Sequence, residues 1–471
     1  MSNEGLVNSQ SSSDYFNKHF GNIDFGSKRI DNRFILSMCM LAQNPDQSIL
    51  MATGSRSNAK AIYRMLANDK FDTEVIIRSH LEGCESVFKE QNILLAIQDT
   101  MSVNYNSHHK TEGLGYAADQ VRGINVHSCL LTTHDGIPIS LAAQYAWTRP
   151  QSKDDSMTNV EKQARPIEEK ESFRWLETLE TAKDNVNEAV KLIHIADREA
   201  DIYELFALAV DLDELFVFRV VHNRIDTEGV HIMSDIRKSK VAGTVSVTIP
   251  PNRQNKTKER DVTLSVQFMD YNLKKPAVRK SDEVLAESVT LTLVRLYEEN
   301  PEPGTEPIEW FLVTNIYIDS PEMALFVSQL YKARWKIERF HYTLKSGCKI
   351  ENIQQRSVDG IVKLILMYSY IAIYYMQVTF LARTSPDTPC DILLSELEYS
   401  TLFRVANETN SDPVEPPTMQ EVIKYLAKLG GFVGAPSDGP PGLKVIWTGL
   451  SRLFLLVQYR QFLCSEFCGS S

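Results

Sequence analysis

The sequence predicts an α/β protein whose sheet-containing middle part lies between two helical regions, one at each end of the chain. Two patterns support this prediction. In residues 20–75 and 362–471, apolar side chains recur at spacings of three and four, which is typical of helices that bury one face. Between these regions, short apolar runs rich in Val, Ile, Leu and Phe alternate with amphipathic stretches, which favours strands interleaved with helices.

Five apolar runs in the middle of the chain are strand candidates. In order they are ILLAIQD, INVHSCLLTTHDG, IPISLAAQYAWT, LIHIADRE and LFVFRVVHN. The stretches ESFRWLETLETAKD and DIYELFALAVD have helical spacing and lie between or after the later strands. Three strands joined by short turns, followed by strand–helix units, fit a ribonuclease-H-like core. We assign this core to residues 76–361.

A second set of strand candidates interrupts the core at about residues 225–318. The runs are TVSVTIPP, RDVTLSVQFMDY, SVTLTLVRLYE and EWFLVTNIYI. Prolines, which are disfavoured inside sheets, mark the turns around these runs: Pro250, Pro251, Pro301, Pro303 and Pro307. The sequence therefore predicts a β-rich insertion.

The two ends of the chain differ in character. Residues 1–19 have neither the basic start nor the apolar run of a signal peptide, so we expect a disordered polar tail. Residues 20–75 should form a small helical domain with a basic face, made by Lys28, Arg29, Arg33, Arg56, Lys60 and Arg64. Such a face either binds DNA or is the ordinary exposed side of amphipathic helices. In residues 362–471 the apolar stretch LILMYSYIAIYYMQVTFLA carries four tyrosines, which favours a core helix over a membrane span.

Composition is that of a folded protein, with 43% hydrophobic and 24% charged residues among 471. Seven scattered cysteines and the absence of a signal sequence favour free thiols in a reducing cytoplasm. The net charge of −11 predicts weak non-specific binding to DNA. A basic segment at residues 237–280 could still contact DNA or form a solvated rim, and we weigh the two equally. Its members are Arg237, Lys238, Lys240, Arg253, Lys256, Lys258, Arg260, Lys274, Lys275, Arg279 and Lys280.

The stretch YKARWKIERFHYTLKSG carries the most specific pattern. Read as one helix, it places four side chains on a single face, since their offsets are 3, 4 and 7: Tyr331, Arg334, Glu338 and Lys345. A carboxylate can hold a divalent metal, while Arg and Lys bind phosphate oxygens. Taken alone, this face would more often be a solvated, salt-bridged surface. Asp99 and Asp197, which each end an apolar run upstream, supply two more carboxylates and suggest a two-metal nuclease or strand-transfer site.

These segments resemble the DDE transposases of the bacterial insertion-sequence-four superfamily, and most closely the transposon-five branch. The helix matches the Y-x2-R-x3-E-x6-K signature without a gap, and IQDTMSVNY and DREADIY match the two aspartate segments. GINVHSCLL, FVFRVVHNR, WFLVTN and AKLGGF also follow in the family order. The resemblance implies that Asp99, Asp197 and Glu338 are catalytic and hold two Mg²⁺ or Mn²⁺ ions per site.

The resemblance also implies DNA-binding residues. Tyr331, Arg334 and Lys345 would hold phosphates beside a flipped nucleotide that stacks on Trp310. Arg33 and Arg64 would contact the transposon end, and Arg219, His222 and Arg224 would contact DNA near it. The apolar context of Trp310 also fits a buried strand residue, and a lone histidine is more often structural.

The activity implied is that of a cut-and-paste transposase. It would bind terminal inverted repeats, nick them, form and open a hairpin, and join the ends to target DNA. Residues 362–471 would make it a homodimer in the synaptic complex. Its location would be the bacterial cytoplasm, at the nucleoid and not in a membrane. The alternative is a catalytically silent regulator derived from such an enzyme, which the low net charge weakly favours. An unrelated α/β nuclease would not explain the basic N-terminal helices or the insertion.

Overall fold

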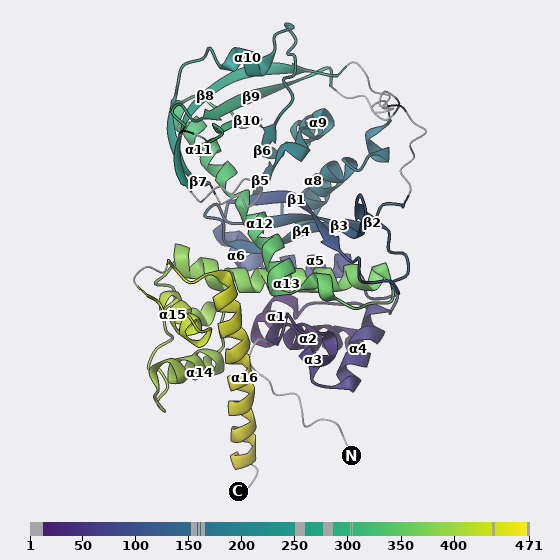
Figure 1. The fold of residues 1–471 in the computed structure, drawn as a ribbon, viewed down its shortest axis with the longest axis vertical. Coiled ribbons are helices and arrows are strands. Elements are labelled where there is room, and N and C mark those ends of the chain that lie inside the picture. The colour runs from purple at the N-terminus through teal and green to yellow at the C-terminus, as the bar shows by residue number, and fades with distance from the viewer. Residues whose placement is uncertain are drawn as a thin grey trace.

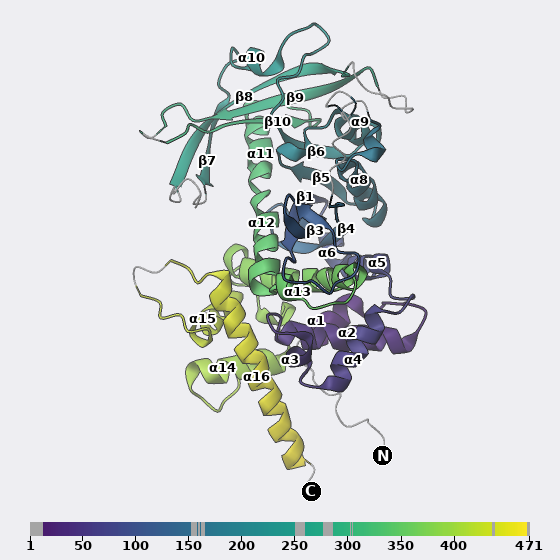
Figure 2. The same ribbon diagram turned by 45° about the vertical axis from the view of Figure 1, so that its right-hand side comes forward.

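The computed structural model describes residues 13–151, 158, 161, 165–249, 260–276, 286–301, 303, 305–435 and 439–468. The molecule is elongated, with the sheet in the upper part of Figure 1 and helical domains below it. Helices α1 (Ser13–Phe20) and α16 (Leu443–Cys468), the first and last of the described helices, both lie in this lower, helical part. Helices α11 (Pro321–Lys332) and α12 (Trp335–Tyr342) run from the sheet toward these helical domains, as the turned view in Figure 2 shows.

The first half of the sheet has the topology of a ribonuclease-H-like core. Strands β1, β3 and β4 pair antiparallel, whereas β5 and β6 follow parallel to β1, in the order β4-β3-β1-β5-β6. Their bounds are β1 (Ile93–Asn104), β3 (Val121–Thr132), β4 (Pro138–Trp147), β5 (Lys191–Ala196) and β6 (Leu215–Val220). A three-residue strand, β2 (Tyr116–Ala118), pairs with the edge of β3. The α/β fold class with this core is therefore confirmed.

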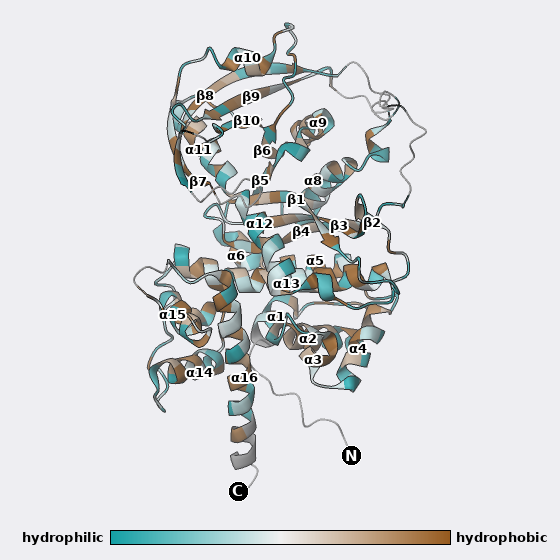
Figure 3. Ribbon diagram, in the orientation of Figure 1, coloured by the Kyte–Doolittle hydropathy of each residue, from teal (hydrophilic) through white to brown (hydrophobic). Residues whose placement is uncertain are grey.

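The insertion continues the same sheet. Strand β10 pairs antiparallel with β6, and β9, β8 and β7 follow outward from it. The bounds are β7 (Gly243–Ile249), β8 (Arg260–Lys274), β9 (Ser288–Tyr297) and β10 (Glu309–Thr314), with the short helix α10 (Ile232–Ile236) beside them. β7 alternates buried and exposed residues, as expected where one face of a sheet is covered. In Figure 3, hydrophobic (brown) and hydrophilic (teal) residues both occur along these outer strands.

Helices cover both faces of the core sheet. On one face α8 (Phe173–Asn185) contacts β3 and β4, and α9 (Tyr203–Asp211) contacts β6. The other face carries α11 (Pro321–Lys332) over β6 to β9, and α12 (Trp335–Tyr342) over β1. Four short 3-10 turns connect elements, and one π-helical turn follows α12: Ile167–Glu169, Arg198–Ala200, Ile350–Asn352 and Cys390–Ile392, and Thr343–Gly347.

The N-terminal helices correct one expectation. Residues 13–20 form helix α1, and Tyr15 and Phe16 are buried in the core, so the end of the expected disordered tail is ordered. The sequence predicts disorder up to residue 19 because the polar stretch before this amphipathic helix continues into its first residues. Residues 1–12 lie outside the described part. The helices that follow are α2 (Lys28–Gln43), α3 (Ile49–Thr53), α4 (Arg56–Leu66), α5 (Thr73–Gly83) and α6 (Glu85–Glu90).

The C-terminal helices pack around one long helix, α13 (Val358–Thr384). Among the described helices it alone is long and apolar enough to cross a membrane, yet 94% of its most apolar window is buried inside the protein. This burial is that of a core helix, as the tyrosines predict. The remaining helices are α14 (Glu396–Asn407), α15 (Met419–Leu429) and α16 (Leu443–Cys468). Capping boxes start α14 and α15, at Ser395 and Thr418.

Candidate active site

Asp99 lies within β1 rather than at its end. The strand continues to Asn104, because the polar residues after Asp99 still pair with β3 in register. This corrects the expectation that Asp99 ends an apolar strand. The Asp99 side chain is 17% exposed. Its Oδ1 accepts a hydrogen bond of 2.7 Å from the backbone N–H of Thr100, which fixes the carboxylate.

Asp197 follows directly after β5, as predicted. Because β5 is parallel to β1 and Ala196 is paired with Gln98, Asp197 and Asp99 occupy neighbouring positions on adjacent strands. Asp197 caps the 3-10 turn that follows, and its Oδ1 accepts a 2.8 Å hydrogen bond from the backbone N–H of Glu199. Two backbone N–H groups thus orient the two aspartates, and the sequence pattern did not single out Thr100 or Glu199.

The four signature residues do not lie on one continuous helix. Helix α11 ends at Lys332, α12 starts after Arg334, and a π-helical turn replaces the regular helix at Thr343. Tyr331 is buried at the end of α11, Glu338 lies in α12, and Lys345 lies in the π-helical turn. Arg334, at the start of α12, places Nη2 2.6 Å from Oε1 of Glu338.

Asp197 and Glu338 both lie near enough to Asp99 for their charges to act on its carboxyl group. The pKa of Asp99 is raised to about 7, first by burial, then by the charge of Asp197 and, more weakly, by that of Glu338. The backbone N–H of Thr100 and the guanidinium of Arg334 oppose this rise. Repulsion among close carboxylates is the ordinary property of a site that binds cations.

His341 is a site residue that the sequence pattern did not pick out. It lies one turn after Glu338 in α12, with Nδ1 4.0 Å from Oδ2 of Asp99. Burial, reinforced by Lys345 and Arg334, lowers the pKa of His341 to about 3, so the ring is neutral. Its offset of three from Glu338 places it on the same helix face, and this spacing could have identified it.

Trp310 and Tyr331 form an aromatic pair beside the carboxylates. Their ring centroids are 6.0 Å apart in an edge-on arrangement, and the Arg219 guanidinium lies 5.8 Å from the Trp310 ring centroid. Trp310 is partly exposed, whereas Tyr331 is buried. Burial raises the pKa of Tyr331 to about 12, while Arg334 and Arg219 oppose the rise. The structure therefore brings Trp310, Tyr331 and Arg219 together next to the acidic cluster.

His222 and Arg224 share one buried partner, Asp201. The Asp201 side chain is 1% exposed and lies 2.7 Å from His222 Nδ1 and 2.7 Å from Arg224 Nη2. Arg224 is itself largely buried, whereas 67% of the His222 side chain is exposed. Arg224 thus has a structural role in this state, as the counter-charge of Asp201, and a DNA contact by Arg224 would compete with it.

The N-terminal basic residues lie on α2 and α4. Arg64 is exposed on α4. Arg33 on α2 is partly buried, and its Nη1 donates a 3.2 Å hydrogen bond to Asn58 Oδ1. Lys28, Arg29, Arg56 and Lys60 are all exposed, so a basic surface on these two helices is available.

The basic segment in the insertion is largely ion-paired where it is described. Four of its members form ion pairs: Arg237 with Glu309, Lys238 with Asp235, Arg260 with Glu298 and Lys275 with Glu287. Ion-paired cations have less charge to offer to phosphate. Arg253, Lys256, Lys258, Arg279 and Lys280 lie outside the described residues.

A buried hydrogen-bond chain runs on the sheet face opposite Asp99. Thr100 Oγ1 donates to His127 Nδ1 at 2.8 Å, and His127 Nε2 donates to Gln98 Oε1 at 3.3 Å. Gln98 Nε2 donates to His194 Nδ1 at 3.3 Å, and His194 Nε2 donates to Glu214 Oε2 at 3.3 Å. In each link the donor bonds to the next residue of the chain, so His127 and His194 each accept at Nδ1 and carry their proton on Nε2. The chain ties β3, β1 and β5 together at the level of Asp99.

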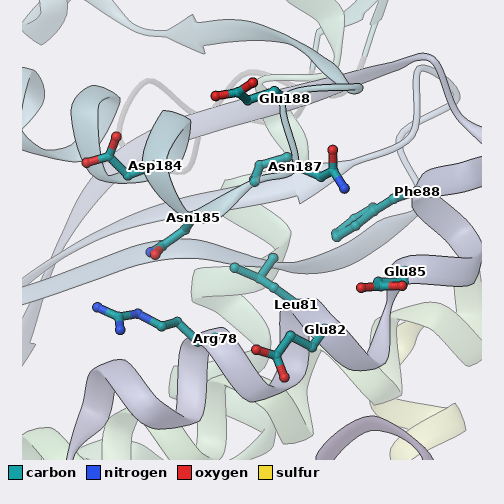
Figure 4. Close-up of a pocket in the computed structure, with 10 residues that line it drawn as sticks. Arg78, Leu81, Glu82, Glu85, Phe88, Asp184, Asn185, Asn187 and Glu188 are labelled. Atoms are coloured by element: carbon teal, nitrogen blue, oxygen red, sulfur yellow. The ribbon is translucent and has the colours of Figure 1, made fainter.

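A separate cavity of about 660 Å³ opens between α5, α6 and the turn after α8 (Figure 4). Four carboxylates line it, those of Glu82, Glu85, Asp184 and Glu188, with Arg78 as a cation. This lining does not suit DNA phosphates, and none of the predicted site residues belongs to it.

Comparisons with known proteins agree with this architecture. The transposase DNA-binding model matches residues 12–71, the transposase DDE domain model residues 172–375, and the transposase Tn5 dimerisation domain model residues 370–467. Among solved structures, the chain is similar to a piggyBac transposase in a synaptic complex with hairpin DNA. The match has 10% identity and a TM-score of 0.35, and covers 88% of this chain and 74% of that chain. A likeness at that score is too distant to define the site.

The three matched domains together define the class of protein. A transposase DDE domain cleaves DNA and transfers strands, and such domains generally use divalent metal ions. The domain before it binds DNA, and the domain after it forms a dimer. The chain is therefore a DNA transposase, and it belongs to the DDE transposases of the Tn5 type.

Proposed function

We propose that this transposase works by cut and paste: it binds terminal inverted repeats, nicks them, forms and opens a hairpin on the element, and inserts the element by strand transfer. The observation that carries the proposal is the convergence of Asp99, Asp197 and Glu338 beside Arg334, with the Trp310–Tyr331 pair next to them. Phosphoryl transfer needs charge neutralisation and positioning, and this cluster provides groups for both.

The residues present fit divalent cations. Asp99, Asp197 and Glu338 offer only carboxylate oxygens, which hard cations such as Mg²⁺ and Mn²⁺ prefer. The raised pKa of Asp99 reflects in part the repulsion by its two acidic neighbours, which bound cations would relieve. We propose that these three residues hold two Mg²⁺ or Mn²⁺ ions. Such ions supply a polarised nucleophile and stabilise the charge on the leaving oxygen.

The chain's own residues supply orientation. The backbone N–H groups of Thr100 and Glu199 hold the two aspartates in place. Arg334 and Lys345 bind phosphate oxygens of the end, and Arg334 must leave Glu338 when a cation takes its place. Tyr331 donates a hydrogen bond to the DNA from the same side.

Hairpin formation needs a displaced base, and Trp310 is its stacking platform. Flipping a base costs a few kcal/mol, and stacking on an aromatic ring offsets roughly 1–3 kcal/mol of this cost. Trp310 fits the role because it is partly exposed and braced by Tyr331. Arg219, beside it, binds the adjacent backbone. His222 lies exposed just after β6, the strand that carries Arg219, and contacts the same DNA. Arg224 joins it only if its ion pair with Asp201 opens.

The remaining contacts concern assembly. Arg33 and Arg64 contact the terminal repeats from the N-terminal helices, and two chains pair in the synaptic complex through residues 362–471. We place this activity in the bacterial cytoplasm, at the nucleoid, because the substrate that we propose is DNA.

The deciding experiment uses the DNA that flanks the coding sequence, as short duplexes spanning each candidate terminal repeat. Purified protein is incubated with them and Mn²⁺, and products are separated on a denaturing gel beside the Glu338→Gln variant. Nicks and hairpins at a repeat boundary, absent with Glu338→Gln, are the expected result. DNA retarded on a native gel but uncut by either protein would instead indicate the catalytically silent regulator.

A further inference from the structure

Three buried side chains with metal-binding atoms meet among the N-terminal helices, away from the carboxylates. His19 lies in the last turn of α1, His80 lies in α5, and Cys84 occupies the turn between α5 and α6. Their exposed fractions are 8%, 0% and 1%. One donor atom from each lies within 4.8 Å of the others. None of the three takes part in the proposed DNA chemistry.

The distances among them suit one shared ion. Cys84 Sγ lies 3.6 Å from His19 Nδ1 and 3.6 Å from His80 Nδ1. An ion at about 2.3 Å from sulfur and about 2.0 Å from nitrogen separates those two ligand atoms by about 3.5 Å. The imidazole centroids are 5.0 Å apart, with planes inclined by 17°. Ser140 Oγ, 2.9 Å from His80 Nδ1, offers a weaker fourth donor.

Hydrogen bonding can also join these groups, but only weakly. The Cys84 thiol can donate to one of the two nitrogens that lie 3.6 Å from its sulfur, and its sulfur can accept from the other only if that nitrogen carries the ring proton. His80 Nδ1 is already within hydrogen-bond distance of Ser140, and His80 Nε2 is buried with no hydrogen-bond partner among the described residues.

The imidazoles are in the form that binds metals. Burial lowers the pKa of His19 to about 4, with Lys18 adding to the effect, and lowers the pKa of His80 well below its usual value. Both rings are therefore neutral at physiological pH. Burial raises the pKa of the Cys84 thiol to about 12, so the thiol loses its proton only when a cation compensates the charge.

Charge selects among the possible cations. The site supplies one thiolate and two uncharged imidazoles. A divalent ion would therefore leave a net positive charge in a buried site, which is costly. A monovalent ion with one thiolate is neutral. Thiolate and imidazole ligands together favour the soft cation Cu(I) over hard cations.

We propose that His19, His80 and Cys84 form a buried binding site for a soft monovalent cation, Cu(I). Binding exchanges the thiol proton for the ion: the S–H bond breaks, an S–Cu bond forms, and the proton leaves to solvent, with no change of oxidation state. The ion joins α1, within the DNA-binding match at residues 12–71, to α5 and to Ser140 of β4. Bound copper would thus link helix α1 to helix α5 and strand β4, and so hold the DNA-binding helices against the core sheet.

The test measures copper capture by the full-length protein. Cu(I) is kept reduced by ascorbate without oxygen and is presented as its coloured bicinchoninate complex, whose absorbance falls as protein takes the ion. The wild type should remove one equivalent per chain. Cys84→Ser and His19→Gln should bind at least about 100-fold more weakly. Cys129→Ser is the matched control, because this cysteine is equally buried but lies in β3.

Several outcomes would overturn the proposal. Capture of no copper by the wild type would do so, as would equal capture by the wild type and both site variants. Tighter binding of Zn²⁺ at Cys84, seen as a cobalt–thiolate absorption band in a Co²⁺ titration, would reject the monovalent ion. Circular dichroism of each variant identifies misfolding. If Cys84→Ser unfolds, His19→Gln decides, and X-ray absorption of the loaded wild type must show one sulfur and two nitrogen neighbours.

Discussion

The Arg334 guanidinium lies 2.6 Å from the Glu338 carboxylate, Nη2 to Oε1, so the proposed phosphate-binding cation is paired with the proposed metal ligand. The Arg334 side chain is 11% exposed, whereas that of Glu338 is 40% exposed. In this state Arg334 compensates one negative charge of the acidic cluster. If divalent ions bind Glu338 as we propose, they would neutralise its carboxylate and leave Arg334 free to bind a phosphate.

Arg334→Lys should slow DNA cleavage by about 100-fold, because lysine keeps the charge but lacks the planar fork that grips phosphate at two oxygens. Binding of end DNA on a native gel should change little. Cleavage rates on a repeat duplex measure the effect, with Arg339→Lys, at an exposed position of α12, as the control. Undiminished cleavage by Arg334→Lys would exclude a forked phosphate contact.

Asp99→Asn should stabilise the metal-free protein at pH 8 but not at pH 4. The folded pKa of Asp99, about 7, lies above the ordinary value of 3.8, so wild-type stability falls as pH rises between these two values. The difference in free energy of unfolding at pH 8 is at most about 4 kcal/mol. Urea unfolding in EDTA at both pH values measures it.

The control for this comparison is Asp211→Asn, at an exposed position at the end of α9. Adding Mn²⁺ at pH 8 should reduce the advantage of Asp99→Asn, since the ions bind and stabilise the wild type. An equal stability difference at both pH values would show that burial and the neighbouring carboxylates do not raise the pKa of Asp99.

Trp310→Ala should leave the first nick intact and impair hairpin formation, because only the second step needs a displaced base to stack. Trp310→Phe keeps a ring and should retain most hairpin formation. A time course on a denaturing gel separates the two products. Equal loss of nicking and hairpin formation in Trp310→Ala would point instead to a packing role against Tyr331.

Arg64→Ala should weaken binding of the terminal repeat and lower the slope of log affinity against log salt by about 1, as expected for one lost phosphate contact. The measurement is fluorescence anisotropy of a labelled repeat over a series of salt concentrations. Arg78→Ala removes another exposed arginine, in α5, where it pairs with Glu74, and should change neither quantity. An unchanged salt slope in Arg64→Ala would remove this residue from the interface.

The sequence predicted the α/β class and the ribonuclease-H-like order of strands, because short-range patterns carry this information. Asp197 illustrates this success: an apolar run followed by an acidic turn identifies the end of a strand. The continuation of β1 beyond Asp99 escaped prediction, since it depends on pairing with β3, which is distant in sequence.

The signature stretch shows a second limit. Its spacing predicts one helix, yet the regular helix is interrupted between Tyr331 and Arg334 and again at Thr343. This segment packs against the sheet and α13, and these contacts override the local helix propensity. The offsets still bring Arg334 to Glu338. Contacts made across the fold, such as Asp201 with Arg224, have no local signal, and neither has the cluster of His19, His80 and Cys84.

The most direct test of a metal centre at Asp99 is a change of metal specificity. Asp99→Cys replaces a hard oxygen ligand by a softer sulfur, which favours Mn²⁺ over Mg²⁺. Nicking of a repeat duplex is measured in each metal for Asp99→Cys and the wild type. We predict that the wild type nicks in both metals and that Asp99→Cys nicks only in Mn²⁺. Nicking by Asp99→Cys at the wild-type rate in Mg²⁺ would contradict the assignment of Asp99 as a metal ligand.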